Sequence, residues 1–211
     1  MLFVAGCTGN PPEILHVDVT LVLRLDPSTQ ARYESLRVYV AVRDLDGDDD
    51  VALLQIVQDD QQLVWEFARE EWLTTTYGGD RWIGTSDLRM ADDAPIARGA
   101  YRALVRDAAQ QQVAADFFVT HRAVDLPEVA FPTFERRAGR VSVVSADETL
   151  LRAYNRSGEL VVNERVAPGP LADEIARRLD QAGVRVYLER EHDSGATLEY
   201  GPADWDSIGR S

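Results

Sequence analysis

The densest group of side chains that could do chemistry is an acidic segment in the first quarter of the chain. The segment reads DLDGDDD, and its carboxylates fall at alternating positions: Asp44, Asp46, Asp48 and Asp50. Calcium prefers several hard oxygen ligands, and loops that bind it supply them at alternating positions. These four aspartates are therefore the candidate metal ligands of the sequence, with calcium as the candidate ion.

The spacing of this segment does not fit the calcium loop of EF-hand proteins. That loop needs glycine at its sixth position and glutamate at its twelfth. In the frame that starts at Asp44 these positions hold Asp49 and Gln55, and the frame that starts at Asp46 fails as well. Aspartate and glycine also favour bends between strands. We therefore interpret the segment as a solvated turn without a cofactor, and calcium remains the alternative.

Signals for catalysis are few in this sequence. It has no nucleophile elbow, no phosphate-binding glycine loop and no His-Glu-x-x-His or Cys-x-x-Cys motif. One stretch combines carboxylates with aromatic rings, as a glycoside cleft does; it contains Trp65, Glu66, Glu70, Glu71, Trp72 and Trp82. Aromatic residues at this density are also typical of a sandwich core. We predict that the chain is not an enzyme, and a glycan-binding or glycan-acting cleft is the alternative.

Composition limits the partners. The chain of 211 residues has 36 acidic against 22 basic residues, a formal net charge of −14. A protein with this charge repels nucleic-acid phosphates and anionic lipid headgroups. Nucleic-acid binding is therefore excluded, and any membrane association needs an anchor instead of a basic face.

The single cysteine follows a short apolar run at the start of the chain. Val4-Ala5-Gly6-Cys7 resembles the lipobox of bacterial lipoproteins, in which an aliphatic residue and small residues precede the cysteine. The resemblance implies that the Cys7 thiol carries diacylglycerol and that the peptide is cut before it. Several acyl chains on one residue anchor a protein stably, whereas one chain alone is marginal.

The segment before Cys7 is shorter than a signal peptide and has no basic residue. We interpret residues 1–12 as the remnant of a signal peptide whose start lies upstream, the lipidation site, and a short tether that ends at Pro12. Under the alternative, Cys7 is incidental and the chain is cytoplasmic.

Beyond the tether the sequence alternates as β-strands do. Residues 16–25 read HVDVTLVLRL, which places Val17, Val19, Leu21, Leu23 and Leu25 inward and His16, Asp18, Thr20 and Arg24 outward. Further strands are expected at 36–43, 51–57, 62–67, 101–106 and 113–119. Many short strands separated by turn signals predict a β-sandwich over residues 13–122.

One of these strands carries a family resemblance. Pro95, Gly99-Ala100-Tyr101, Val105 and Asp107 resemble the penultimate strand of immunoglobulin-like and fibronectin-type modules, where Gly-x-Tyr enters the strand and an acidic turn leaves it. The resemblance covers roughly residues 13–120. It implies the fold of that region and no particular activity.

The remainder predicts a second, smaller domain. Prolines at 127 and 132 indicate an extended linker over 123–133, because proline cannot donate to a strand ladder. Residues 134–205 are expected to form an α+β unit of hairpin, helix and hairpin, and residues 206–211 a tail. The helix follows Pro170, ends at Gly183, and has this apolar face: Leu171, Ile175, Leu179 and Ala182.

The sequence therefore predicts a mainly β protein with a small α+β unit. Its expected role is that of a non-enzymatic, lipid-anchored protein of the bacterial cell envelope, facing the periplasm or the cell surface. Its expected partners are the membrane, through Cys7, and an envelope protein for which it is a binding or structural module.

Overall fold

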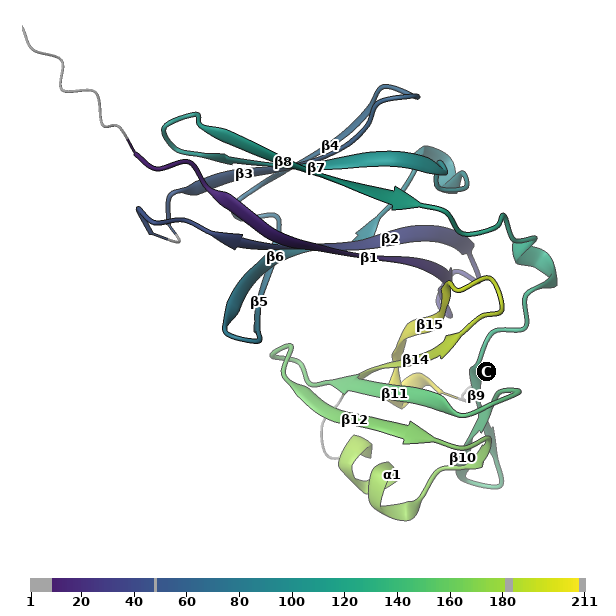
Figure 1. The fold of residues 1–211 in the computed structure, drawn as a ribbon. Coiled ribbons are helices and arrows are strands. Elements are labelled where there is room, and N and C mark those ends of the chain that lie inside the picture. The colour runs from purple at the N-terminus through teal and green to yellow at the C-terminus, as the bar shows by residue number, and fades with distance from the viewer. Residues whose placement is uncertain (1–8, 48, 181–183, 209–211) are drawn as a thin grey trace, which may run out of the picture. The chain divides into compact units, whose positions relative to one another are not determined.

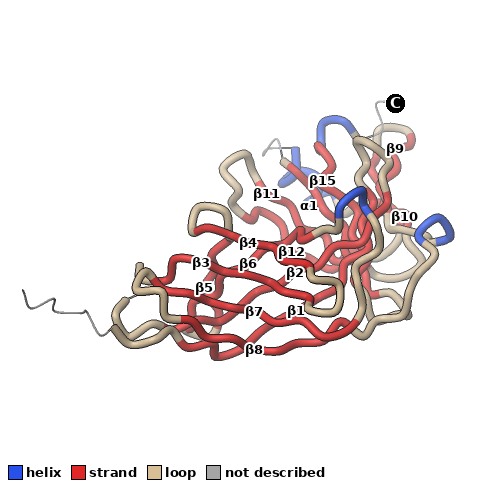
Figure 2. The backbone as a smooth tube through the Cα atoms, turned by 90° about the horizontal axis from the view of Figure 1, so that it is seen from above, coloured by secondary structure: helices blue, strands red, loops and turns tan. Residues whose placement is uncertain are grey.

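The computed structural model describes residues 9–47, 49–180 and 184–208, and within them the chain is mainly β-structure (Figures 1 and 2). The predicted fold class, mainly β, is confirmed at this level. The lipobox Val4–Cys7, Asp48, Ala182 and Gly183 lie outside the described residues, so the predictions for them stay predictions.

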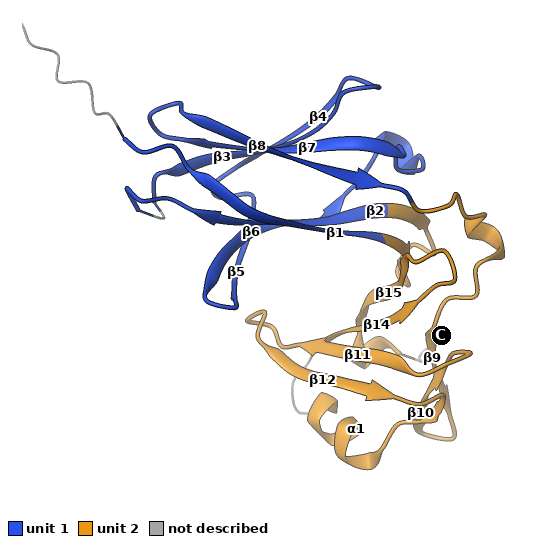
Figure 3. Cartoon of the chain, in the orientation of Figure 1, with its two compact units in different colours: residues 1–21, 35–120 blue, residues 22–34, 121–211 orange. Residues whose placement is uncertain are grey.

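The described chain divides into two compact units (Figure 3). Unit 1 comprises residues 1–21 and 35–120, and unit 2 comprises residues 22–34 and 121–211. The sequence had assigned residues 22–34 to the first domain. They belong to unit 2 because residues Val22–Leu25 pair in parallel with Thr197–Tyr200 near the end of the chain, a long-range contact that local periodicity does not reveal.

Unit 1 contains two sheets, which Figure 1 shows as two layers. Their strands are β1 (Glu13–Leu25), β2 (Arg32–Arg43), β3 (Val51–Gln58), β4 (Leu63–Ala68), β5 (Leu73–Tyr77), β6 (Asp80–Leu88), β7 (Gly99–Asp107) and β8 (Gln112–Val119). One layer is the run β1-β2-β6-β5 of an eight-stranded sheet with the order β12-β11-β14-β15-β1-β2-β6-β5, and the other is the four-stranded sheet β4-β3-β7-β8. Alternate residues of β2 are buried, as its periodicity predicts: Leu36, Val38, Val40 and Val42.

Tyr101 lies at the centre of the second sheet. Its side chain is 1% exposed, and its ring stacks on Phe117 with 5.3 Å between ring centroids. The hydroxyl donates a hydrogen bond to the carbonyl oxygen of Ala97 at 2.7 Å. Burial raises the pKa of the Tyr101 hydroxyl to about 12, so the hydroxyl keeps the proton that it donates.

Unit 2 follows a hairpin–helix–hairpin order after a small three-stranded sheet. Its remaining elements are β9 (Thr133–Arg137), β10 (Arg140–Val144), β11 (Thr149–Tyr154), β12 (Leu160–Val166), β13 (Gly169–Pro170), α1 (Asp173–Asp180), β14 (Arg185–Glu191) and β15 (Thr197–Asp204). The main sheet of the unit has the order β12-β11-β14-β15-β1, and the small one β13-β10-β9. No described helix, α1 included, could span a membrane by its length and apolarity.

Helix α1 covers the core of unit 2 with the predicted apolar face. Ile175 and Leu179 are buried, and Leu171 just before the helix is buried with them. The acidic Asp173 and Glu174 occupy the first turn, where they complement the positive end of the helix dipole. Trp205 closes the core and donates its indole N–H to Asp180 Oδ1 at 2.7 Å.

The segment 123–133, expected to be a linker, is packed into unit 2. Val129 and Phe131 are 7% and 8% exposed. Residues 123–132 form no strand, yet two of their carbonyl groups are satisfied by a side chain: Arg32 Nη1 donates to the carbonyl oxygens of Leu126 at 2.9 Å and Pro127 at 2.7 Å. The expected tail also differs, because Ile208 is buried in the same core.

Arg24 departs from the predicted outward position in β1. It is 6% exposed, and its Nη1 lies 2.5 Å from Oε1 of Glu199, which is 3% exposed. The parallel register of β1 and β15 places the two residues opposite each other. Both faces of β1 are buried from Leu21 onward, so the polar face of the strand needs an ion pair there.

We expect the substitution Arg24→Met to lower the free energy of unfolding by about 3–5 kcal/mol, because it removes the cation that lies 2.5 Å from the buried Glu199 carboxylate. The double substitution Arg24→Met/Glu199→Leu should recover most of the loss. Urea denaturation measures both effects. The matched control is Arg165→Met in β12, which removes an exposed pair with Glu148 and should cost less than about 1 kcal/mol. Equal losses at the two positions would contradict the argument.

Candidate functional sites: an acidic cluster and an aromatic groove

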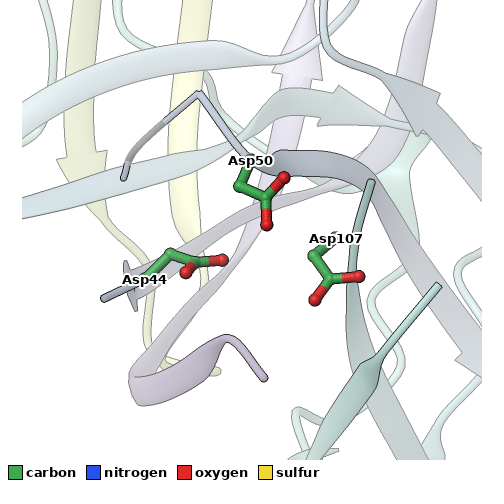
Figure 4. A group of neighbouring side chains, drawn as sticks. All are labelled: Asp44, Asp50 and Asp107. Carbon is green, nitrogen blue, oxygen red and sulfur yellow. The ribbon is translucent and has the colours of Figure 1, made fainter. Parts of the chain in front are cut away.

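Three aspartates from distant parts of the sequence meet at one end of unit 1 (Figure 4). Asp44 directly follows β2, Asp50 directly precedes β3, and Asp107 is the last residue of β7. One carboxylate oxygen of each lies within 4.8 Å of one oxygen of each of the others. We call this group the acidic cluster.

Backbone pairing brings the cluster together. In the antiparallel ladder of β3 and β7, Val51 lies opposite Asp107. The amide of Ala108 then donates to the carbonyl oxygen of Asp50 at 2.8 Å, which ties the β2–β3 loop to the β7–β8 turn. Within the loop, Gly47 adopts a φ of 119°, a conformation that side chains disfavour, and the amide of Asp50 donates to its carbonyl oxygen at 3.0 Å.

The two most buried carboxylates of the cluster each use one oxygen to hold their own loop. Asp44 Oδ1 accepts from the amide of Asp46 at 2.9 Å, and Asp107 Oδ1 accepts from the amide of Gln111 at 2.7 Å. Their second oxygens, both Oδ2, are buried and have no hydrogen-bond partner among the described residues. Asp107 as a whole is 0% exposed. The cluster therefore contains two buried carboxylate oxygens that have no hydrogen-bond donor among the described residues.

The cluster concentrates negative charge. Loss of solvation raises the pKa of the Asp50 carboxyl, and the carboxylates of Asp107 and Asp44 raise it further. The arginines next to the cluster in sequence are engaged elsewhere. Arg43 pairs with Glu13 and Asp80 at 3.8 and 3.5 Å, and Arg106 donates to Gln110 at 3.3 Å.

Sequence reasoning identified only part of this cluster. Of the four predicted candidates, Asp44 and Asp50 belong to it and Asp48 lies outside the described residues. Asp46 holds the start of the chain instead: it accepts from the amide and the side-chain amide of Asn10 at 2.5 and 3.2 Å. Asp107 was missed as a ligand candidate. The one sequence feature that could have indicated it is its position at the end of the strand that begins with Gly99-Ala100-Tyr101.

A second candidate site is a groove of about 440 Å³ on the sheet β1-β2-β6-β5. Six side chains line it: His16, Asp18, Tyr39, Thr75, Tyr77 and Trp82. His16 packs edge-on against Trp82 with 5.8 Å between ring centroids. The Trp82 indole N–H donates to the carbonyl oxygen of Tyr77 at 3.3 Å, and Tyr77 itself is 77% exposed.

Gly84 makes room for one wall of this groove. In the β2–β6 ladder it lies opposite Tyr39. A Cβ atom at Gly84 would lie 2.9 Å from Tyr39 Cδ1 and 2.0 Å from the carbonyl oxygen of Val38. The aromatic ring can therefore lie across the strand only because this position has no side chain.

The structure separates the residues of the predicted tryptophan and glutamate cleft. Trp65 and Glu66 lie in β4, in the sheet that does not carry the groove; Trp65 donates to the carbonyl oxygen of Arg89 at 2.9 Å and Glu66 accepts from Gln55 at 2.6 Å. Trp72 is buried at 6% exposure. Glu70 and Glu71 are exposed in the turn after β4, where Glu71 accepts from the amide of Ala68. Only Trp82 lines the groove.

Unit 2 has a larger open pocket of about 910 Å³ near its C-terminal strand. Arginines and acidic residues line it together, among them Arg136, Arg156, Arg185, Glu135 and Asp204. Because both charge signs are present, the pocket does not select one class of ligand.

Comparison with known proteins gave no sequence relative. No family model matches the chain, and no curated protein matches it. Among solved structures, it is similar to Tp47, the 47-kilodalton lipoprotein of Treponema pallidum, with 10% identity and a TM-score of 0.41 over 90% of this chain and 50% of that one. It is also similar to dimeric latent PorU from Porphyromonas gingivalis, with 16% identity and a TM-score of 0.35 over 92% and 20%. The chain thus spans half of the first and a fifth of the second, and TM-scores below 0.5 do not define a shared fold.

The raised pKa of Asp50 gives a test of the cluster's electrostatics. In metal-free buffer at pH 7, Asp50→Asn should raise the unfolding temperature, because it removes one of three mutually repelling carboxylates. Because the pKa of Asp50 is raised in the folded state, protonation of Asp50 at acid pH stabilises the folded wild type. This stabilisation is lost as the pH rises through the folded-state pKa. The advantage of the variant should therefore vanish at about pH 3.

Thermal unfolding in EDTA across this pH range measures the difference. Asp49→Asn serves as the control, because Asp49 is the exposed neighbour that pairs with Arg69. A variant Asp50→Asn that is less stable than wild type at pH 7 would count against repulsion within the cluster.

Proposed function

We propose that this protein is a non-enzymatic binding protein of the bacterial cell envelope, anchored to the membrane by lipid at Cys7. The observation that carries the proposal is the sequence Val4-Ala5-Gly6-Cys7 placed directly ahead of a folded chain whose first strand begins at Glu13. Lipidation sites lie at such a boundary because the modified cysteine becomes the new amino terminus.

The described chain is attached to unit 1 from Gly9 onward. Gln111 Nε2 donates to the carbonyl oxygen of Gly9 at 2.7 Å, and Asn10 binds Asp46. Two residues of extended chain reach roughly 7 Å. A lipid on Cys7 therefore holds this end of unit 1 close to the membrane surface.

The charge of the protein supports a covalent anchor. With a formal net charge of −14, the protein is repelled by anionic headgroups, so adsorption through a basic face is unfavourable. Acyl chains provide binding that does not depend on surface charge.

The proposed architecture of unit 1 is an immunoglobulin-type sandwich. In that fold one sheet has strand order A-B-E-D and the other contains C-F-G. The observed orders β1-β2-β6-β5 and β4-β3-β7-β8 correspond to A-B-E-D and to C-F-G with one added edge strand. The hydrogen bond from Tyr101 to the carbonyl of Ala97, four residues upstream, resembles the tyrosine corner of such domains. Both features support the proposed fold and imply no particular activity.

Expression in a bacterium with a complete signal peptide should yield a detergent-partitioning protein that is heavier than the cleaved polypeptide. Cys7→Ser should abolish the added mass and release the protein into the soluble fraction, because a hydroxyl does not form the thioether. Mass spectrometry and Triton X-114 partitioning measure both. Unmodified wild type, or a Ser variant that stays with the membrane, would overturn the anchor.

A second candidate function is glycan binding in the groove of unit 1. Sugar rings present apolar C–H faces that pack on aromatic rings, and their hydroxyl groups donate to carboxylates. The groove offers Trp82, Tyr77 and Tyr39 beside the carboxylate of Asp18. Among its lining residues Asp18 is the one carboxylate, whereas glycoside hydrolysis uses a pair. The geometry therefore favours binding without cleavage.

On a glycan array, and by calorimetry with N-acetylglucosamine oligomers, Trp82→Ala and Tyr77→Ala should each weaken binding at least tenfold. Tyr77 is mostly exposed, so its removal leaves the fold intact. The matched control is Phe118→Ala, which removes a ring that is 66% exposed on β8 in the other sheet. Absence of any glycan ligand, or equal loss in the Phe118 variant, would exclude the groove.

A further inference from the structure

We propose that the acidic cluster of Asp44, Asp50 and Asp107 is a calcium-binding site. This reverses the interpretation of the segment as an ordinary solvated turn, because that interpretation lacked the third carboxylate. The site is independent of the lipid anchor and of the aromatic groove.

The spacing of the ligand atoms fits one calcium ion. Calcium–oxygen distances are about 2.3–2.6 Å, so two ligands on opposite sides of the ion lie about 5 Å apart. The three carboxylate oxygens lie within 4.8 Å of one another, a separation close to that of oxygens that share one calcium ion. Magnesium, with distances of about 2.0–2.1 Å and a strict octahedral geometry, requires a tighter arrangement.

The burial of Asp107 distinguishes this cluster from a group of exposed carboxylates. Asp107 is 0% exposed, and its Oδ2 has no hydrogen-bond partner among the described residues. Figure 4 shows the carboxylates of Asp44 and Asp50 beside it, facing a common space. A buried carboxylate oxygen without a donor is unfavourable. A cation between the three groups supplies the missing partner for Asp107 Oδ2 and Asp44 Oδ2 at once.

The hydrogen bonds around the cluster prepare it for an ion. Asp44 and Asp107 each hold one oxygen on a backbone amide, and their other oxygen is buried without a hydrogen-bond partner among the described residues. Asp50 is only partly buried, so water can complete the six to eight oxygen ligands of calcium. With an all-oxygen donor set the site favours a hard cation over zinc or copper. Its affinity should resemble that of extracellular calcium modules, on the order of 10⁻⁴–10⁻³ M.

The test uses the full chain carrying Cys7→Ser, so that failure of the anchor proposal does not affect it. The protein is freed of metal with EDTA, dialysed, and titrated with calcium chloride by calorimetry. We expect one ion per chain and, at 5 mM calcium, a rise in the unfolding temperature of several degrees, because a ligand of the folded state stabilises it. Magnesium at the same concentration should have a smaller effect.

Two variants locate the ion. Asp107→Asn keeps the acceptor for Gln111 but removes the charge, and it should weaken calcium binding at least tenfold. Asp50→Asn, at a more exposed position, should also weaken calcium binding at least tenfold. This second variant keeps the test valid if Asp107→Asn does not fold. Asp49→Asn removes a charge from the same loop outside the cluster and should bind calcium as the parent does.

Absence of heat and of any thermal shift at 5 mM calcium would overturn the proposal. A stronger response to magnesium than to calcium, or a loss in Asp49→Asn equal to that in Asp50→Asn, would overturn it as well.

Discussion

The antiparallel pairing of β3 with β7 determines where the chemistry of unit 1 can lie. Because Val51 lies opposite Asp107, the residue that precedes β3 and the residue that ends β7 are brought together at one edge of the sheet. Asp44 arrives from β2, in the other sheet, through a loop that turns at Gly47. The cluster therefore joins the two sheets at that edge. The hydrogen bond from the amide of Ala108 to the carbonyl oxygen of Asp50 holds the backbone of two of its three residues together.

The same edge receives the start of the folded chain. Gln111, whose amide holds Asp107, also holds Gly9 through its side chain, and Asp46 in the acidic loop holds Asn10. The loops that form the proposed calcium site are thus the ones that fix the segment following Cys7. In the proposed envelope setting, an ion at the cluster stiffens the attachment between the anchor and unit 1.

The sequence predicted strands well where one face is buried and the other is solvated. Period-two alternation located β2, β3 and the first half of β1, and it placed His16 and Asp18 outward, where they line the groove. The alternation pattern gave a wrong prediction where both faces of a strand are buried. It placed Arg24 outward, because no residue near Arg24 in the sequence indicates that Glu199 lies opposite it. The helix face was predictable from spacing because Leu171, Ile175 and Leu179 recur at helical intervals.

The candidate sites were harder to predict because they depend on tertiary pairing. Two of the three cluster residues came from one acidic loop, which local spacing could identify, but the third came from a strand end more than fifty residues away. The predicted tryptophan and glutamate cleft was likewise built from residues that are close in sequence, and the structure places them in different elements. Neighbours in sequence such as Trp65 and Trp72 lie in another sheet or in the core, while Trp82 meets His16 from the first strand.

What decides between a solvated turn and an ion site is therefore the environment of Asp107, not the composition of the loop. Three exposed carboxylates at this spacing would be satisfied by water and would need no ion. Asp107 is fully buried, and one of its oxygens has no hydrogen-bond partner among the described residues, which is unfavourable. The proposed cation between Asp44, Asp50 and Asp107 supplies that partner, which the acidic loop alone would not require.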